Sequence, residues 1–597
     1  MEAVTLADYQ RGALRAGFRA AVARGDARPL LFPACIVPSF VLPAVFLTVA
    51  GRYAFLKPLR YPLAVLITAF NLNLFRTGST PITSSINMAS AYGAGLAWGW
   101  GTLWVFVVLV WIDPWDGERV KRRARAKGSP PVTMTEADAI DEDVAQCLRA
   151  GQEYYWQSFP VDGSFWSRLD WSWDLCLAWR GVGWSWSKSP IPHFAPPKNP
   201  HTEELVQLSS NPEVTYQGYR RHRTRSAFLR NRLFAFATAY IILDICSVLM
   251  THDPHFILGP PPSFIKGVSS WSEQISLYPG GIHPPPVALF EIPPYLQNLY
   301  TRHPNILSLF RSILGLAGVL AALHMFLSFD QFVRVYFGPL LFPASSTSSM
   351  ATAIQLWNYP TIFGSVTLIL DHGLAGFWGG WWHQTFRMAF VEPTAWLVDH
   401  GFLPGPLPSQ SKKNTKHTQP ATDKNTKDKS ETGRKERESL PRITRLVGLI
   451  IAFTQSALLH AAGSATSLPD HAYWHMPFLF FLLAGVGVVI QTGLQMAILN
   501  RLPRPIRRAG NLMFALGWLH ATQWLFIDDL ARSGIWLFEP VPFSFVRFLK
   551  GLFSSGSNSI ISPAGSSRAG HAAWRWYRDD FPFWHTGQTW YETGLAV

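Results

Sequence analysis

Runs of apolar residues that are long enough to cross a lipid bilayer dominate this sequence and leave few folds open to it. A membrane-spanning helix needs about 20 consecutive, mostly apolar residues. Such runs lie at about residues 29–51, 61–75, 90–112, 231–250, 305–328, 446–466, 474–499 and 511–530. Residues 534–553 add a further span, and 335–370 form either another span or an interfacial helix with a re-entrant turn. We therefore expect an all-α polytopic membrane protein with about eight to ten transmembrane helices.

The composition agrees with this fold class. Only 15% of the residues are charged, whereas soluble proteins carry roughly a quarter. The net charge of +14 follows from the concentration of Lys and Arg in cytosolic loops of membrane proteins. Because the basic residues lie between apolar runs, we exclude nucleic-acid binding. The four cysteines lack the spacing of a zinc site, and we expect no bound metal.

The charges also divide the chain into regions. Basic clusters border the loop 113–230 at both ends, which places this loop in the cytosol. Counting back from it puts the N-terminal arginines outside, so one early segment does not span. We expect N-terminal transmembrane segments in 1–112, a cytosolic loop in 113–230, a central membrane region in 231–404, a disordered linker in 405–440 and a C-terminal membrane region in 441–597. The linker mixes both charge signs with Ser and Thr and has no apolar periodicity.

One histidine lies deep within an apolar run. His460 follows Leu446 by about 14 residues, which is roughly 20 Å along a helix and still inside the hydrocarbon layer. A polar residue at this depth is costly, and is therefore a functional candidate. A neutral imidazole there can accept a proton from an alcohol and act as a general base. The alternative is a histidine that hydrogen-bonds a neighbouring helix, and position alone favours neither.

A second feature is the aromatic run FWGGWWHQTFR at residues 377–387. An interfacial amphipathic helix anchored by Trp would explain the aromatic residues. It would not explain His383 and Gln384, which lie side by side within the run. A polar pair walled by aromatic rings suits a pocket for a thioester carbonyl, since one donor would stabilise the oxyanion of acyl transfer.

This run resembles the F-W-G-x-x-W-H-Q-x-x-R signature of fungal wax-synthase-like proteins, a branch of the membrane-bound O-acyltransferases. Four more segments resemble that branch, in the same order: 180–186 (R-G-x-G-W-x-W), 356–365 (Trp, Pro and Phe in close succession), 456–460 (S-G-x-x-H) and 524–528 (W-x-x-x-D). Three positions depart from the branch. Ala457 replaces a glycine, Gly380 stands where Arg is frequent, and Gln491 stands where some relatives carry an acidic pair.

The resemblance implies an active centre of two histidines inside a reaction chamber enclosed by the helices. His460 would be the general base, and His383 would hold the oxyanion or the acyl carbonyl. The substrate-binding and coenzyme A-binding residues would be Trp378, Trp382, Gln384, Arg387 and Arg180. Arg180 and Arg387 are the candidates for the phosphates of coenzyme A, and the alternative role for Arg180 is contact with lipid headgroups.

The resemblance also implies a reaction. The chain would move an acetyl or other short acyl group from acyl-CoA to a hydroxyl of a lipophilic secondary metabolite, such as a terpenoid or meroterpenoid. Acetyl-CoA would be a co-substrate, with no bound cofactor, and the protein would be a multi-pass protein of the endoplasmic reticulum. The alternatives are a wax ester synthase that uses long-chain acyl-CoA, a membrane transporter, and a catalytically inactive scaffold. No internal repeat supports the transporter.

Other polar residues in or near the apolar runs are expected to be structural. Asp244 would pair helices, and His324 and His520 would be packing histidines with satisfied hydrogen bonds. Asp528 and Asp529 lie near the end of a run, where we expect solvated carboxylates.

Overall fold

The structure is a computed structural model. It describes residues 5–75, 81–125, 141–188, 190–260, 293–343, 346–406, 440–467, 473–554, 574, 582–587 and 592–596. The predicted linker 405–440 lies almost entirely outside the described residues.

Five helices within the described residues are long and apolar enough to cross a membrane. They are α4 (Met88–Phe106) with its continuation η4 (Val107–Trp111), α8 (Arg225–Met250), α12 (Pro304–Leu341), α17 (Arg442–Ala465) and α18 (His475–Ala497). Each coincides with a run that the sequence analysis predicted to span the bilayer. The prediction of an all-α polytopic membrane protein is confirmed.

The other predicted runs form shorter elements, so the expected eight to ten spans exceed the five found in the described part of the chain. The run 29–51 is divided among β1 (Ala27–Pro29), β2 (Leu31–Phe32), η1 (Ala34–Ile36), η2 (Val37–Val41) and α2 (Leu42–Ala50). The run 61–75 forms α3 (Arg60–Leu72), whose 13 residues extend only about 20 Å. The run 511–530 is split between α19 (Arg504–Thr522) and α20 (Trp524–Arg532).

Two uncertain segments also become short elements. The segment 335–370 contains the end of α12, then α13 (Ser349–Ala353), η7 (Leu356–Asn358) and the start of α14 (Thr367–Gly376). The segment 534–553 contains η10 (Ile535–Leu537) and most of α21 (Phe545–Ser554). Further helices outside the loop 113–230 are α1 (Leu6–Ala23), η3 (Ala54–Leu59), α9 (Pro254–Leu258), α11 (Pro294–Arg302), α15 (Arg387–Asp399) and η9 (Leu499–Arg501).

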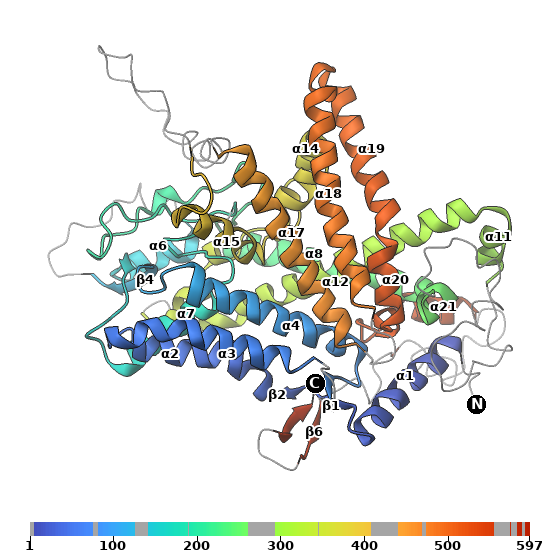
Figure 1. Ribbon diagram of the computed structural model, residues 1–597, viewed down its shortest axis with the longest axis horizontal. Coiled ribbons are helices and arrows are strands. Elements are labelled where there is room, and N and C mark those ends of the chain that lie inside the picture. Colours follow the sequence, from blue (N-terminus) through green and yellow to red (C-terminus); the bar gives the residue numbers. More distant parts are fainter. Residues whose placement is uncertain are drawn as a thin grey trace.

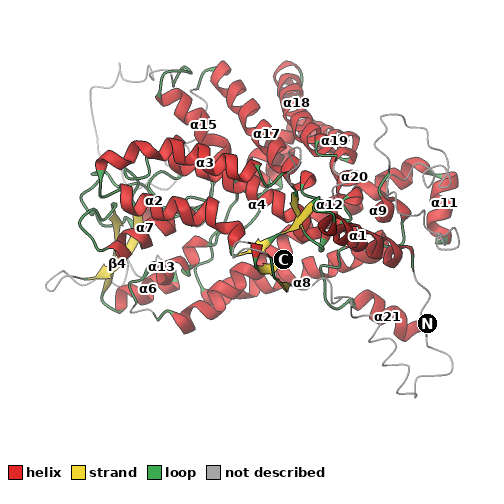
Figure 2. Cartoon of the chain, turned by 60° about the horizontal axis from the view of Figure 1, so that its bottom comes forward, coloured by secondary structure: helices red, strands yellow, loops and turns green. Residues whose placement is uncertain are grey.

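The loop 113–230 is folded. β4 (Arg119–Ala124) pairs antiparallel with β5 (Gln152–Gln157), flanked by α6 (Glu142–Arg149), α7 (Phe165–Leu177) and η5 (Leu208–Ser210). A buried aromatic core containing Trp104, Trp171 and Trp184 joins this unit to α4, and α7 packs on α2. The other strands are short: β3 (Ile82–Ser84) pairs with β1, and β7 (Gly594–Ala596) pairs with β2 and with β6 (Phe583–His585). Figure 2, with helices red and strands yellow, shows how few strands accompany the helices.

Helix α17 contacts both α4 and α18, and Figure 1 shows α17, α18 and α19 as a group, with α4 at the lower end of α17. Small residues bring α4 and α17 together: a Cβ added at Gly95 would lie 1.9 Å from the carbonyl oxygen of Ala462. Small residues are the usual device for close helix contacts in membranes. This contact fixes the part of α17 that carries His460.

Candidate active site

One cavity of about 2690 Å³ holds both histidines that the sequence analysis predicted to be catalytic. Ordinary ligand pockets occupy about 300–1,000 Å³, so this cavity has room for two substrates. Its lining includes His460 of α17, His383, residues of the folded loop 113–230, and residues of α8 and α12. The predicted reaction chamber therefore corresponds to a cavity in the structure.

Helix α17 presents His460 to this cavity between two aromatic rings. The imidazole stacks on Phe481 with ring centroids 4.2 Å apart and meets the edge of Phe526 at 5.3 Å. Its Nδ1 is buried, and no group in the described part of the chain hydrogen-bonds it. A histidine retained only to hydrogen-bond a neighbouring helix through Nδ1 would show such a partner. The ring therefore makes no structural hydrogen bond through Nδ1 within the described residues.

His383 comes from a loop outside the five candidate spans. The π-helical turn η8 (Phe377–Trp381) ends the helix expected across the aromatic run, and the chain is extended at Trp382. The His383 ring packs near Trp382 at 5.3 Å and Phe386 at 5.7 Å. Burial, followed by the positive charge of Arg180, lowers the pKa of His383 to about 4. The imidazole is therefore neutral at physiological pH, with one nitrogen donating and the other accepting.

Aromatic rings connect the two histidines. Trp378 lies 5.8 Å from Phe481, the ring on which His460 stacks, and 5.6 Å from Trp382 beside His383. Both imidazoles line the same cavity. Both predicted tryptophans line the cavity. The fold thus brings together two residues that lie on separate elements of the chain.

The polar residues of the run 377–387 hold its own backbone. The Gln384 amide nitrogen donates to the carbonyl oxygen of Trp382 at 2.6 Å. Arg387 donates to the Gln384 side-chain oxygen at 2.6 Å and to the carbonyl oxygen of Gly379 at 3.1 Å. Both side chains also line the cavity. Substrate contacts of Gln384 and Arg387 remain predictions. Their hydrogen bonds hold the backbone around His383 in its conformation.

Tyr219 is a further contributor that sequence reasoning missed. Its hydroxyl donates to the carbonyl oxygen of Gly380 at 2.7 Å and lies 2.9 Å from that of Trp382. The residue is fully buried, and burial raises the pKa of its hydroxyl, which therefore keeps its proton. Tyr219 lies in the loop 113–230, and no spacing relates it to the run 377–387.

Arg180 does not take the place that the sequence analysis predicted for it. It is not among the residues that line the cavity, and burial lowers the pKa of its guanidinium to about 10. Its charge acts on His383 and Tyr219. The residues that follow it form a tight turn, with Gly181 at φ +66° and Gly183 at φ +78°. The structure supports an electrostatic effect of Arg180 on His383. A contact between Arg180 and coenzyme A stays a prediction.

Two other polar residues, Asp244 and His520, have polar partners of the kind that we expected, whereas the expected hydrogen bond of His324 stays a prediction. Asp244 accepts a hydrogen bond from the backbone N–H of Val546 at 3.0 Å, which ties α8 to α21. The His520 ring lies 2.9 Å from the Ser312 hydroxyl. His324 packs edge-on against an aromatic ring. All three therefore fit packing roles.

The prediction of solvated carboxylates at the end of the run 511–530 is wrong. Asp529 is fully buried and accepts a hydrogen bond from Ser464 at 2.9 Å, and Asp528 lies 3.1 Å from His255. The reason is the break after Thr522, which turns α20 inward against α18 and α9. Burial raises the pKa of Asp529 to about 7.

Comparison with known proteins gives one match. A model described as the membrane bound O-acyl transferase family matches residues 359–483. No curated protein and no solved structure matches the chain. The matched segment contains both His383 and His460. The match indicates an O-acyltransferase enzyme, and together with the apolar helices it indicates a multi-pass membrane protein.

Proposed function

We propose, from the premise that this chain is a membrane O-acyltransferase, that it transfers an acetyl or other short acyl group from acyl-CoA to a lipophilic alcohol. The acceptor would be a secondary metabolite such as a terpenoid or meroterpenoid, and the membrane that of the endoplasmic reticulum. One observation carries the proposal: the partly buried His460 ring, whose Nδ1 has no hydrogen-bond partner among the described residues, lines the same cavity as His383.

The reaction needs one base and one donor. His460 takes the proton of the acceptor hydroxyl, and the alkoxide oxygen attacks the thioester carbonyl carbon. The neutral imidazole of His383 donates a hydrogen bond to the oxyanion that develops. The C–S bond then breaks, and the thiolate of coenzyme A recovers the proton from the His460 imidazolium. Buried aromatic walls keep water from the thioester.

The loop 113–230 supplies the side of the cavity that suits coenzyme A. Lys188, His193 and Gln207 line it there. Lys188 is half exposed and lies 2.9 Å from the carboxylate of the buried Glu392. A lysine at a polar opening can meet the phosphates of a soluble donor, while the thioester extends inward to the histidines.

A second candidate is a wax ester synthase, because a cavity of about 2690 Å³ also has room for a long acyl chain. The fungal branch that the motif resembles is associated with acetylation, which favours the short donor. The two candidates share a chemistry and differ only in the donor.

Membranes that contain the chain test the proposal. They are given isotopically labelled acetyl-CoA with a panel of terpenoid alcohols, and products are identified by the mass that they gain. We expect acetyl esters and an equal amount of free coenzyme A, absent from membranes without the chain. A preference for palmitoyl-CoA over acetyl-CoA would favour the wax ester synthase. Transfer from no acyl-CoA would contradict both candidates.

A further inference from the structure

The cavity has two chemically different ends. The end at the loop 113–230 is polar. The other end, which we call the apolar arm, is lined by Leu243, Cys246 and Met250 of α8, Leu316 and Val319 of α12, and Trp536 of η10. The hydrocarbon part of a ligand can bind in this arm, whereas the phosphate groups of a donor cannot.

The apolar arm begins at the catalytic centre. Phe526 packs against the His460 ring at 5.3 Å. The same phenylalanine packs against the buried core that contains Cys246 and Trp536 of the arm. A molecule that occupies the arm would therefore reach the base with one end.

One polar side chain faces the arm from α8. Leu243, Cys246, Ser247 and Met250 follow helical spacing and share one face, and all four line the cavity. Ser247 is buried, and its hydroxyl donates to a carboxylate oxygen of Glu539 at 3.1 Å.

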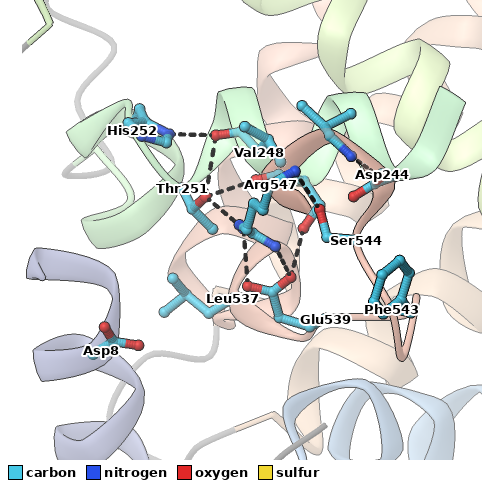
Figure 3. A network of polar contacts seen from close by, with 12 residues as sticks. Asp8, Asp244, Val248, Thr251, His252, Leu537, Glu539, Phe543, Ser544 and Arg547 are labelled. Carbon is cyan, nitrogen blue, oxygen red and sulfur yellow. Dashed lines mark hydrogen bonds and ion pairs between the residues drawn. The ribbon is translucent and has the colours of Figure 1, made fainter. Parts of the chain in front are cut away.

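A buried ion pair holds that carboxylate in place. Glu539 is 1% exposed and is paired with Arg547 at 2.8 and 3.1 Å. Arg547 also donates to the Thr251 hydroxyl at 3.2 Å. Figure 3 shows this network between α8 and the segment that leads into α21. The carboxylate fixes the direction of the Ser247 O–H bond.

The hydroxyl oxygen of Ser247 retains lone pairs after its hydrogen is donated to Glu539. We propose that the apolar arm holds the hydrocarbon body of the acceptor, and that Ser247 accepts a hydrogen bond from a second hydroxyl of that acceptor. This inference rests on the proposed function. The substrate class becomes a lipophilic diol, with one hydroxyl at His460 and another at the remote end of the arm.

An acyl chain is a poorer occupant of the arm. Its methyl end carries no hydrogen-bond donor, so the lone pairs of the Ser247 oxygen would be buried against hydrocarbon without a donor, although the hydroxyl still donates to Glu539. Polar atoms buried in that way lower stability or affinity. An acceptor with a second hydroxyl therefore fits both the apolar lining of the arm and Ser247, whereas an acyl chain fits only the apolar lining.

The test compares two terpenoid alcohols of the same skeleton, one with a single hydroxyl and one with a second, remote hydroxyl. Labelled acetyl transfer is measured for the wild type, Ser247→Ala and the control Ser247→Thr. We expect the wild type to prefer the diol. Ser247→Ala should lower kcat/KM for the diol about threefold to tenfold and leave the mono-alcohol unchanged, which also reports correct folding. Ser247→Thr should keep the preference.

Equal loss for both alcohols, or no change in Ser247→Ala, would overturn the inference while the proposed function stands. Transfer to neither alcohol by the wild type would overturn the proposed function and the inference with it.

A filling variant tests which substrate lies in the arm. Val319→Trp should abolish transfer to both terpenoid alcohols and retain transfer to a small alcohol such as isopropanol. The control, Ile313→Trp, changes an exposed position of the same helix and should leave every rate unchanged. If Val319→Trp instead shortens the acyl chain accepted from a series of acyl-CoA donors, and bulky acceptors still react, the arm holds the acyl chain.

Discussion

The two histidines of the candidate active site are held in different ways. Backbone hydrogen bonds from Tyr219 and Gln384 fix the loop that carries His383. Packing positions the His460 ring, through Phe481 stacked on it and the close approach of α4 to α17. The Tyr92 hydroxyl of α4 adds one hydrogen bond, to the backbone carbonyl oxygen of His460 at 3.3 Å. A loop needs hydrogen bonds to keep one conformation, whereas a membrane helix has its own bonds satisfied and needs only a neighbour at the right distance. Substitutions in the two regions should therefore have different effects on stability and on the rate of acyl transfer.

The largest expected effect is at the packed region. A Cβ at Gly95 would lie 1.9 Å from a backbone atom of α17, which cannot move without shifting the helix that carries His460. Gly95→Ala should lower stability by about 1–3 kcal/mol and remove most acyl transfer. Thermal unfolding in detergent and initial rates measure both. Gly93→Ala is the control, since its Cβ would meet nothing within 4 Å. Equal stability and equal initial rates for the two variants would contradict the role assigned to the contact between α4 and α17.

The next effect is at the hydrogen-bonded region. Tyr219→Phe removes the hydroxyl that binds the backbone on both sides of Trp381 and should displace His383. We expect a loss of about tenfold in kcat, because small misplacements of catalytic groups are costly. The melting temperature should fall less than in Gly95→Ala. An unchanged kcat would mean that the loop keeps its shape without this bond.

A smaller effect separates two roles of Arg387. Arg387→Lys keeps the charge and loses the planar geometry that joins Gln384 to Gly379. If the residue mainly shapes the turn, kcat should fall a few-fold and KM for acetyl-CoA should stay the same. A rise in KM with unchanged kcat would show that it contacts the donor, as the sequence analysis predicted.

The smallest effect concerns pH. Burial and the charge of Arg180 lower the pKa of His383, which keeps the imidazole neutral down to low pH. Arg180→Gln removes one of these causes, so the pKa should rise, and His383 should become charged at a higher pH than in the wild type. A second positive charge opposes proton transfer to His460, so the acid limb of the kcat profile should move to higher pH. A shift to lower pH would contradict the assignment.

The sequence was informative where one physical pattern dominates. Five apolar runs appear as long helices because no soluble fold buries so many apolar residues in a row. His460 was identifiable because a polar residue at that depth needs a reason, and His383 because a polar pair interrupts an aromatic run.

Other features depend on contacts between distant segments. Tyr219 contacts the run 377–387 only through folding of the loop 113–230, which carries no signal for that partner. The run 511–530 looks like one span, but the chain breaks after Thr522 and buries Asp529. The proposed role of Ser247 depends on its hydrogen bond to Glu539, a residue far along the chain that the sequence does not connect with it.

Acetyl transfer by His460→Ala is the most direct test of the general-base assignment. Labelled acetyl-CoA and an accepted terpenoid alcohol are incubated with membranes that contain equal amounts of wild type, His460→Ala or His520→Ala. We predict a loss of about 10²- to 10⁴-fold for His460→Ala and near wild-type rates for His520→Ala, whose ring bonds Ser312. Comparable rates for His460→Ala and the wild type would contradict the account.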